Sequence, residues 1–197
     1  DKKKLEETLD FKFKDRNLLI TFHPVTLESD TSKLQIKELL EAISTLTNTG
    51  FIFTMPNMDT DGKVLFEIIK KFTKDNKNAK LFASLGQVRY LSCIKHVDLV
   101  VGNSSSGLIE VPAFKKPTIN IGDRQKGRLK ANSVIDCDPE KESITNSINK
   151  AFSSEFQNIV RDTINPYGNG GASNKIIKIL EEYNLKNILK KSFYKLP

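Results

Sequence analysis

The chain has 197 residues, of which 38% are hydrophobic and 28% charged, proportions typical of a globular protein and unlike those of a disordered chain. No apolar run approaches the ~18 residues needed to span a bilayer, so we expect a soluble protein that does not enter a membrane. The net charge of +7 comes from lysines spread along the chain. Because no aromatic residues are interleaved with them in a recognisable motif, this charge does not predict nucleic-acid binding.

The two cysteines indicate the cellular compartment, and the first residues indicate whether the sequence is part of a longer protein. Cys93 and Cys137 have neither metal-ligand spacing nor a disulfide framework around them, so we expect core or near-core thiols in a reducing, cytoplasmic setting. No signal peptide opens the sequence, which starts at Asp1 rather than at a methionine. We therefore expect a piece that begins within a longer protein.

Strand-like and helix-like segments alternate along the chain after a charged helix predicted for residues 1–15. Short apolar, β-prone runs predict strands at residues 18–22, 51–53, 80–82, 98–101, 117–121 and 133–135. Apolar residues at helical spacing predict helices at residues 33–47, 62–72, 88–94, 106–114, 143–152 and 176–183. The alternation predicts one α/β domain over residues 1–197, with an open, doubly wound parallel sheet whose ligands sit beyond the carboxyl ends of the strands.

The alternation stops after the helix predicted for residues 143–152. Residues 167–171 (YGNGG) contain four turn formers in succession, which predicts a loop. The last helix follows, and the lysine-rich remainder up to Pro197 is expected to be a tail able to wrap onto a further domain.

The strongest site signal is the serine loop, residues 102–107 (GNSSSG), between a buried strand and a helix. Small side chains let a ligand approach the backbone, and the N–H groups and dipole of a helical first turn attract anions, to which serine hydroxyls add donors. The loop lacks the lysine of a P-loop and the spacing of a dinucleotide fingerprint. It predicts a phosphate site or, equally, a helix capped by serines.

Two further residues could serve an anion held by the serine loop. Glu110 lies one turn into the predicted helix, where its carboxylate either complements the helix dipole or accepts hydrogen bonds from ribose hydroxyls. His23 directly follows the first predicted strand and precedes Pro24. At the carboxyl end of a parallel strand, a histidine projects into the ligand crevice and can donate to a phosphate.

The remaining candidates are less specific. Asn57 follows the second predicted strand and could equally be a turn asparagine. Arg124 and Arg128 follow the fifth strand and could neutralise a diphosphate or be simply solvated. Tyr90, at a helical apolar position, is a core residue or a stacking platform. The second histidine, His96, is expected to have a structural or surface role.

Taken together and in this order, these motifs resemble the carboxyl-terminal half of the hydrolysing UDP-N-acetylglucosamine 2-epimerases, enzymes of sialic and related nonulosonic acid synthesis. The resemblance runs from His23 to the tail. Its matching segments are residues 23–26 (HPVT), 56–59 (PNMD), 102–107 (GNSSSG) with Glu110, 117–122 (PTINIG) with Arg124, Gln125, Gly127 and Arg128, and 167–170 (YGNG). Each segment is weak alone, whereas the ordered set is specific.

The resemblance implies a glycosyltransferase-B-like fold of two domains, in which this chain is the second, Rossmann-like domain and an amino-terminal domain is missing. By match of motif, Ser104, Ser105, Ser106 and the backbone at Gly107 would hold the pyrophosphate of UDP. Glu110 would bind the ribose hydroxyls and Arg124 the phosphates. His23 would assist departure of UDP with Asn57 nearby, and uracil would pack over Tyr90 against the backbone around Leu85.

The family's reaction, as the resemblance implies it, eliminates UDP from UDP-N-acetylglucosamine and adds water to release N-acetylmannosamine. It needs no cofactor and no metal. The carboxylates that act on the sugar belong to the amino-terminal half, so we expect this chain alone to bind uridine nucleotides weakly and to be inactive, and the full-length enzyme to be a homo-oligomer. Two alternatives stay open: a hydrolysing epimerase of UDP-2,4-diacetamido-2,4,6-trideoxyhexose for legionaminic acid synthesis, and the donor domain of a glycosyltransferase.

Overall fold

The computed structural model describes residues 1–25, 31–56, 62–186 and 188–190. Their contacts group the chain into two compact units, Asp1–Tyr167 and Gly168–Pro197. The first unit contains a six-stranded sheet of order β3-β2-β1-β4-β5-β6, in which every neighbouring pair is parallel. Its strands are β1 Arg16–Thr21, β2 Thr49–Thr54, β3 Ala79–Phe82, β4 Leu99–Gly102, β5 Thr118–Ile121 and β6 Val134–Cys137. The predicted doubly wound parallel sheet is confirmed, and each strand lies within two residues of its predicted ends.

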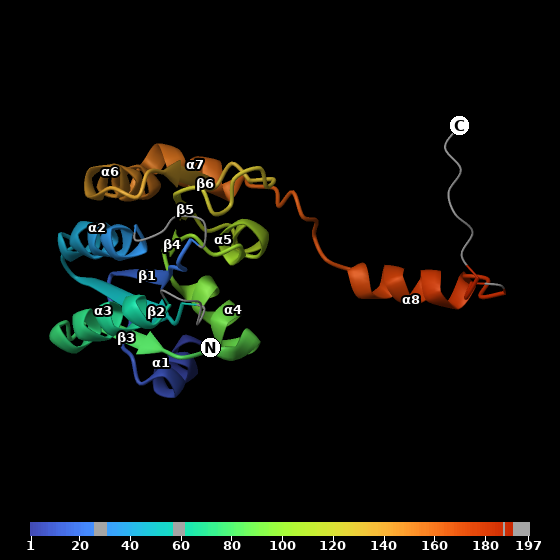
Figure 1. The fold of residues 1–197 in the computed structure, drawn as a ribbon, viewed down its shortest axis with the longest axis horizontal. Helices are drawn as coiled ribbons and strands as arrows, with labels where there is room; N and C mark the ends of the chain where they lie inside the picture. The colour runs from blue at the N-terminus through green and yellow to red at the C-terminus, as the bar shows by residue number, and fades with distance from the viewer. Residues whose placement is uncertain (26–30, 57–61, 187, 191–197) are drawn as a thin grey trace. The chain divides into compact units, whose positions relative to one another are not determined.

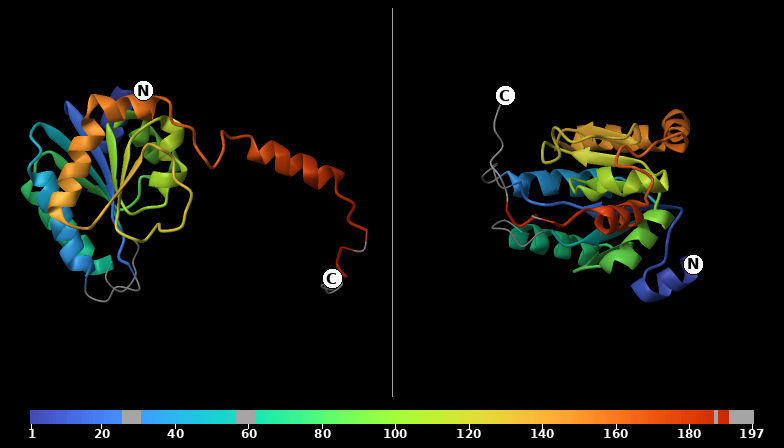
Figure 2. Two further views of the ribbon diagram at one scale, coloured as in Figure 1. Left: turned by 90° about the horizontal axis from the view of Figure 1, so that it is seen from above. Right: turned by 90° about the vertical axis from the view of Figure 1, so that its right-hand side faces the viewer.

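Helices cover both faces of this sheet (Figure 1). Those of the first unit are α1 Lys2–Leu9, α2 Ser32–Ser44, α3 Gly62–Asp75, α4 Gly86–His96, α5 Ser106–Ile109, the 3₁₀ helix η1 Val111–Phe114, α6 Lys141–Phe152 and α7 Ser154–Arg161. The two views of Figure 2 show the sheet between its helical layers. No described helix combines the length and apolar character that a membrane crossing needs.

Two hydrophobic cores follow from this layering. One packs apolar side chains of the strands against α2, α3, α6 and α7, with Phe22, Ile36, Phe51 and Ile148 at most 2% exposed. The other packs the opposite face against α1, α4 and η1, with Leu9, Leu19, Ile52 and Ile94 at most 1% exposed. Because successive side chains of a strand alternate between faces, Leu19 and Ile20 of β1 enter different cores. Burial on both faces explains why these strands are apolar throughout.

Three helix predictions need correction. The first helix ends at Leu9 rather than near residue 15, because Asp10 adopts a left-handed conformation (φ 45°) that terminates it. The helix predicted for residues 106–114 is α-helical only to Ile109 and continues as η1, since Pro112 has no N–H to extend the α-helical ladder.

The third correction is α7, which the sequence reading missed. Its amino-terminal signal was present, because the Ser153 side chain accepts a hydrogen bond from the N–H of Phe156 and Glu155 lies in the first turn. In the second unit, the predicted last helix forms as α8, Ala172–Glu182, after Gly171 in a left-handed conformation.

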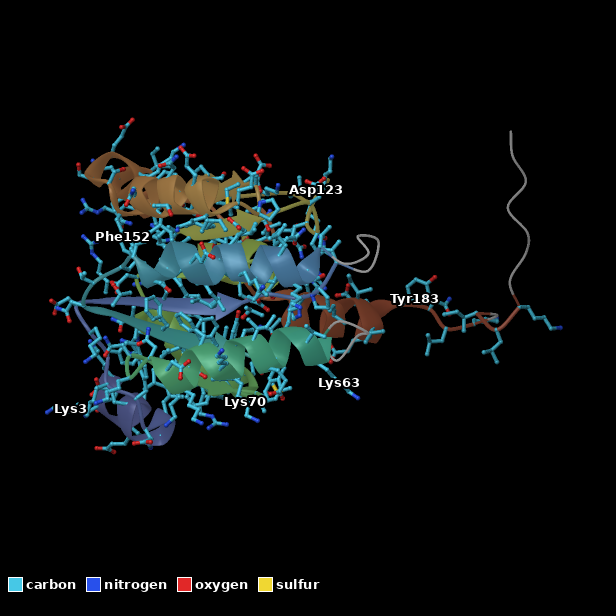
Figure 3. The ribbon with its side chains drawn as sticks, turned by 60° about the vertical axis from the view of Figure 1, so that its left-hand side comes forward. Lys3, Lys63, Lys70, Asp123, Phe152 and Tyr183 are labelled. Atoms are coloured by element: carbon cyan, nitrogen blue, oxygen red, sulfur yellow. The ribbon has the colours of Figure 1, made fainter. Side chains whose placement is uncertain are left out.

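The strands all point the same way, so the sheet has a carboxyl edge and an amino edge. Figure 3 shows Asp123, in the loop after β5, and Lys63, in the first turn of α3, at the edge toward which the strands point. Phe152, the last residue of α6, lies at the opposite edge. Loops at the carboxyl edge connect strands to the helices that follow them, and most of the predicted site residues lie there.

Candidate functional site

A cleft of about 480 Å³ opens at the carboxyl edge beside the ends of β1, β2 and β4. The strand order turns back between β1 and β4, which pair side by side with Thr21 opposite Gly102. Such a switch point is where open α/β sheets bind ligands, because the loops from neighbouring strands diverge there. Six predicted site residues line the cleft: His23, Leu85, Tyr90, Ser104, Ser106 and Glu110.

The serine loop begins with a close approach of two backbones. Gly102 has φ +137°, and a Cβ atom built on it would lie 1.9 Å from the carbonyl oxygen of Thr21. Within the described residues, the N–H groups of Ser104 and Ser105 donate to no protein acceptor, which leaves them available to a ligand oxygen. Since α5 is only four residues long, the loop can offer an anion these local N–H groups and hydroxyls but not the dipole of a long helix.

Tyr90 ties α4 to the serine loop. Its hydroxyl donates a 2.8 Å hydrogen bond to Oγ of Ser106. Burial raises the pKa of the Tyr90 phenol, and the hydrogen bond to Ser106 offsets part of that rise. Nearby, the hydroxyls of Thr21 and Thr54 lie 2.5 Å apart and join the ends of β1 and β2. A row of hydroxyl groups therefore borders the cleft, and Tyr90 is both a wall residue and a hydrogen-bond donor.

Leu85 and Glu110 line the cleft in different ways. Leu85 is 3% exposed, and its carbonyl oxygen accepts a 2.8 Å hydrogen bond from Nε of Arg89. Glu110 is exposed to solvent at the junction of α5 and η1. An exposed carboxylate beside Ser106 offers two acceptor oxygens to ligand hydroxyls.

His23 and Arg124 meet at Asn103. The Asn103 side chain hydrogen-bonds both to the backbone N–H and to the carbonyl of His23. The Asn103 carbonyl accepts from Nη1 of Arg124 at 3.2 Å and from Nε2 of Gln125 at 2.7 Å. The loops after β1, β4 and β5 are thereby joined at one buried residue, so His23 borders the cleft while Arg124 lies against the base of the serine loop.

The other predicted residues take different places. Ser105 and Gly107 belong to the serine loop but do not line the cleft. The structure gives Gly107 a packing reason, since a Cβ atom there would lie 2.7 Å from Cγ2 of Thr118. Asn57 falls outside the described residues. His96 lies away from the cleft, with its ring centroid 6.2 Å from that of Phe13, and burial lowers its pKa, as a structural role predicts.

Several cleft residues were not singled out from the sequence. Thr21, Thr54, Met55, Ser84 and Gln87 line the cleft, and their only sequence signal was their position at or just beyond the ends of predicted strands. Asn103 was treated as part of the serine loop without a role. Among the described residues, no group of three or more histidine, cysteine, aspartate or glutamate side chains is placed to hold a metal ion.

Fold and site thus define a Rossmann-like domain with a switch-point cleft rich in hydroxyl groups. The UDP-N-acetylglucosamine 2-epimerase family model matches residues 1–181, and the chain belongs to this family. It is 43% identical over 195 residues to the GDP/UDP-N,N'-diacetylbacillosamine 2-epimerase (hydrolyzing) of Campylobacter jejuni, covering 98% of this chain and 50% of that protein. It is 42% identical over 184 residues to polysialic acid biosynthesis protein P7 of Escherichia coli, covering 92% of this chain and 47% of that protein.

Solved structures agree on the fold. The crystal structure of the UDP-GlcNAc 2-epimerase from Neisseria meningitidis bound to UDP-GlcNAc has a TM-score of 0.66 and 18% identity, covering 92% of this chain and 48% of that chain. The domain is therefore the Rossmann-like domain of a glycosyltransferase-B-like fold, as the resemblance implied. The chain spans about half the length of the curated relatives it matches.

Proposed function

We propose that this chain is the UDP-binding, carboxyl-terminal half of a cytoplasmic hydrolysing UDP-sugar 2-epimerase that converts UDP-N-acetylglucosamine and water into N-acetylmannosamine and UDP. The observation that carries the proposal is that three separate segments of the sequence, one with His23, one with Tyr90 and one with Ser106 and Glu110, line one cleft. Its size, about 480 Å³, lies within the range of small-molecule sites.

In the proposed reaction, a base removes the proton from C2 of the sugar while the bond from C1 to the UDP oxygen breaks. Water then adds to the resulting glycal, and free N-acetylmannosamine leaves. Departure of UDP is favoured by donors preorganised around the diphosphate, because negative charge grows there in the transition state. The N–H groups and hydroxyls of the serine loop, with His23, would supply these donors. The groups that act on C2 would belong to an amino-terminal half.

The name of one relative favours a second candidate for the sugar of the substrate. The Campylobacter jejuni relative is named for N,N'-diacetylbacillosamine, a 2,4-diacetamido sugar, whereas the relative named for polysialic acid is almost equally similar at 42% identity. Both UDP-sugars should be given to the full-length enzyme and the released hexosamine identified by NMR. Release of N-acetylmannosamine supports the first sugar, and release of only the diacetamido sugar replaces it with the second.

Nucleotide binding by the 197-residue chain can be tested directly. Calorimetry with UDP is expected to show weak binding, and Glu110→Ala to weaken it by about tenfold through loss of a charged acceptor for the ribose hydroxyls. Glu142→Ala is the matched control, because Glu142 is also exposed near a helix end, in the first turn of α6. Absence of heat at millimolar UDP contradicts the proposal, and unchanged affinity of the Glu110 variant contradicts only the ribose role.

A further inference from the structure

Asn103 makes a two-point contact with the main chain of a residue 80 positions away. Its Oδ1 accepts a 2.7 Å hydrogen bond from the N–H of His23, and its Nδ2 donates a 2.8 Å hydrogen bond to the His23 carbonyl. Asn103 is 1% exposed. A side-chain amide that hydrogen-bonds both the main-chain N–H and the main-chain carbonyl of one residue fixes the position and the orientation of that backbone.

The main chain of Asn103 extends the contact to two other segments. Its N–H donates to the carbonyl of Thr21 at 3.2 Å, at the end of β1. Its carbonyl accepts from Gln125 and Arg124, in the loop after β5. The side chain and the carbonyl of this buried residue therefore bond to the loops after β1 and β5, and its N–H bonds to the end of β1.

Gly102 allows this arrangement. Because it carries no Cβ atom, β4 can end directly against the carbonyl of Thr21. This close approach brings the next residue, Asn103, within hydrogen-bond distance of His23. Any larger residue at position 102 would push the two strand ends apart.

We propose that Asn103 is a positioning residue that holds His23, the serine loop and Arg124 in the arrangement that binds a nucleoside diphosphate. The inference rests on the proposed function, because the ligand assigned to these loops is the UDP of the substrate. Asn103 does not line the cleft, so it acts through the residues that it holds. Loops ordered before binding lose less conformational entropy when the ligand arrives, which strengthens binding.

Asn17, near the start of β1, offers a matched control for Asn103. Asn17 is 2% exposed, and its side chain accepts from the N–H of Lys14 at 2.8 Å and donates to the Lys14 carbonyl at 2.9 Å. It makes the same two-point contact with a main chain, at the amino edge of the sheet. Asn17→Ala therefore removes similar hydrogen bonds without touching a residue of the cleft.

The experiment compares UDP affinity and unfolding free energy in the 197-residue chain and its variants. Both Asn103→Ala and Asn17→Ala are expected to lower the free energy of unfolding, but only Asn103→Ala to weaken UDP binding, by about tenfold. Gln125→Met provides a milder second variant, because it removes the donor to the Asn103 carbonyl and keeps the side-chain volume. It is expected to weaken UDP binding by about threefold while the chain stays folded.

The NMR signals of the histidine rings test the positioning role separately from any loss of folding stability. The chain has two histidines, so the ring signals of His23 and His96 can be assigned with one His96→Gln variant. UDP is expected to shift the His23 signal in the unsubstituted chain and in Asn17→Ala. In Gln125→Met and in folded Asn103→Ala the His23 signal should differ before UDP is added and respond less to it, while His96 stays unchanged.

The outcomes separate the two proposals. An unsubstituted chain that binds no UDP overturns the proposed function and this inference with it. If the chain binds UDP and the Asn103 and Gln125 variants bind it as tightly as Asn17→Ala, with an unaltered His23 signal, the positioning role is wrong and the proposed function stands. Weakened binding confined to the Asn103 and Gln125 variants supports the inference.

Discussion

The two ends of β1 are built alike. At the amino edge, Asn17 holds the Lys14 main chain, and its own N–H donates to Oδ2 of Asp98, the residue before β4. At the carboxyl edge, Asn103, the residue after β4, holds the His23 main chain. Both asparagines are buried, and each stands beside a glycine at which a Cβ atom would collide, Gly50 at the amino edge and Gly102 at the carboxyl edge.

The difference lies in what the asparagines hold. The two-point contact of the Asn17 side chain is with a residue three positions earlier and closes a local turn, while its donors to Asp98 tie that turn to the start of β4. Asn103 contacts a residue 80 positions earlier and receives donors from the loop after β5. The cleft described above lies at the carboxyl edge and is lined by residues at or after the ends of β1, β2, β3 and β4. The same side-chain chemistry thus stabilises a turn at one edge and, as we propose, arranges a binding site at the other.

The largest expected difference between the edges is in the free energy of unfolding that is lost when Gly102 or Gly50 is replaced by alanine. Gly102→Ala should lower the free energy of unfolding by about 3 kcal/mol or more, because its Cβ would lie 1.9 Å from backbone and its φ of +137° is strained for alanine. Gly50→Ala should cost about 1–2 kcal/mol, since its nearest neighbours are side-chain atoms of Asn17 and Phe11 that can shift.

Urea unfolding of both variants measures this difference. Equal losses of stability would show that β1 and β4 can separate at the carboxyl edge as easily as side chains shift at the amino edge. In that case the close approach at Gly102 is not what places Asn103 beside His23.

A smaller effect is expected inside the serine loop, at Gly107. Gly107→Ala should destabilise the fold by about 1–3 kcal/mol through overpacking, because the new Cβ would meet Cγ2 of Thr118 at 2.7 Å. Adding Thr118→Ser removes that methyl group and keeps the hydroxyl, which donates to the Gly107 carbonyl at 2.9 Å. The double variant should recover part of the lost stability in thermal unfolding. If it recovers none, Gly107 is required for a reason other than packing.

The smallest expected effect concerns Tyr90, which links α4 to the carboxyl edge. Tyr90→Phe should cost about 0.5–1.5 kcal/mol at neutral pH through loss of the hydrogen bond to Ser106. Burial raises the pKa of Tyr90 in the folded chain. The contribution of the protonated phenol to the free energy of unfolding is therefore complete below the ordinary pKa of 10.0 and is lost as the pH rises through the higher pKa of the folded chain.

The stability difference between the unsubstituted chain and Tyr90→Phe should therefore narrow above about pH 10. Cys93, whose pKa burial raises to about 12, is present in both chains and cancels in the comparison. Unfolding free energies measured from pH 8 to 11 test this. A difference that stays constant across this interval would contradict a raised pKa of the partly buried Tyr90.

The sequence predicted the strands and the main helices because buried parallel strands are apolar runs and covering helices repeat at helical spacing. It predicted His23, Tyr90, Ser104, Ser106 and Glu110 as one site through position at strand ends and through resemblance, and the structure places these residues around one cleft. It missed α7, whose serine cap followed the preceding helix without a gap, and it overextended the helix after the serine loop past Pro112.

The alternation of strands and helices could be predicted from the sequence, and so could the doubly wound sheet with its loops at the carboxyl edge. The positions of these elements can be predicted because hydrophobic periodicity, helix caps and turn-forming residues each depend on only a few neighbouring residues. Three contacts could not be predicted from the sequence: Asn103 reaches His23, Arg124 lies under the serine loop rather than in the cleft, and Tyr90 donates to Ser106. These contacts join residues 16 to 80 positions apart, and they depend on strand order and register, which no local pattern records.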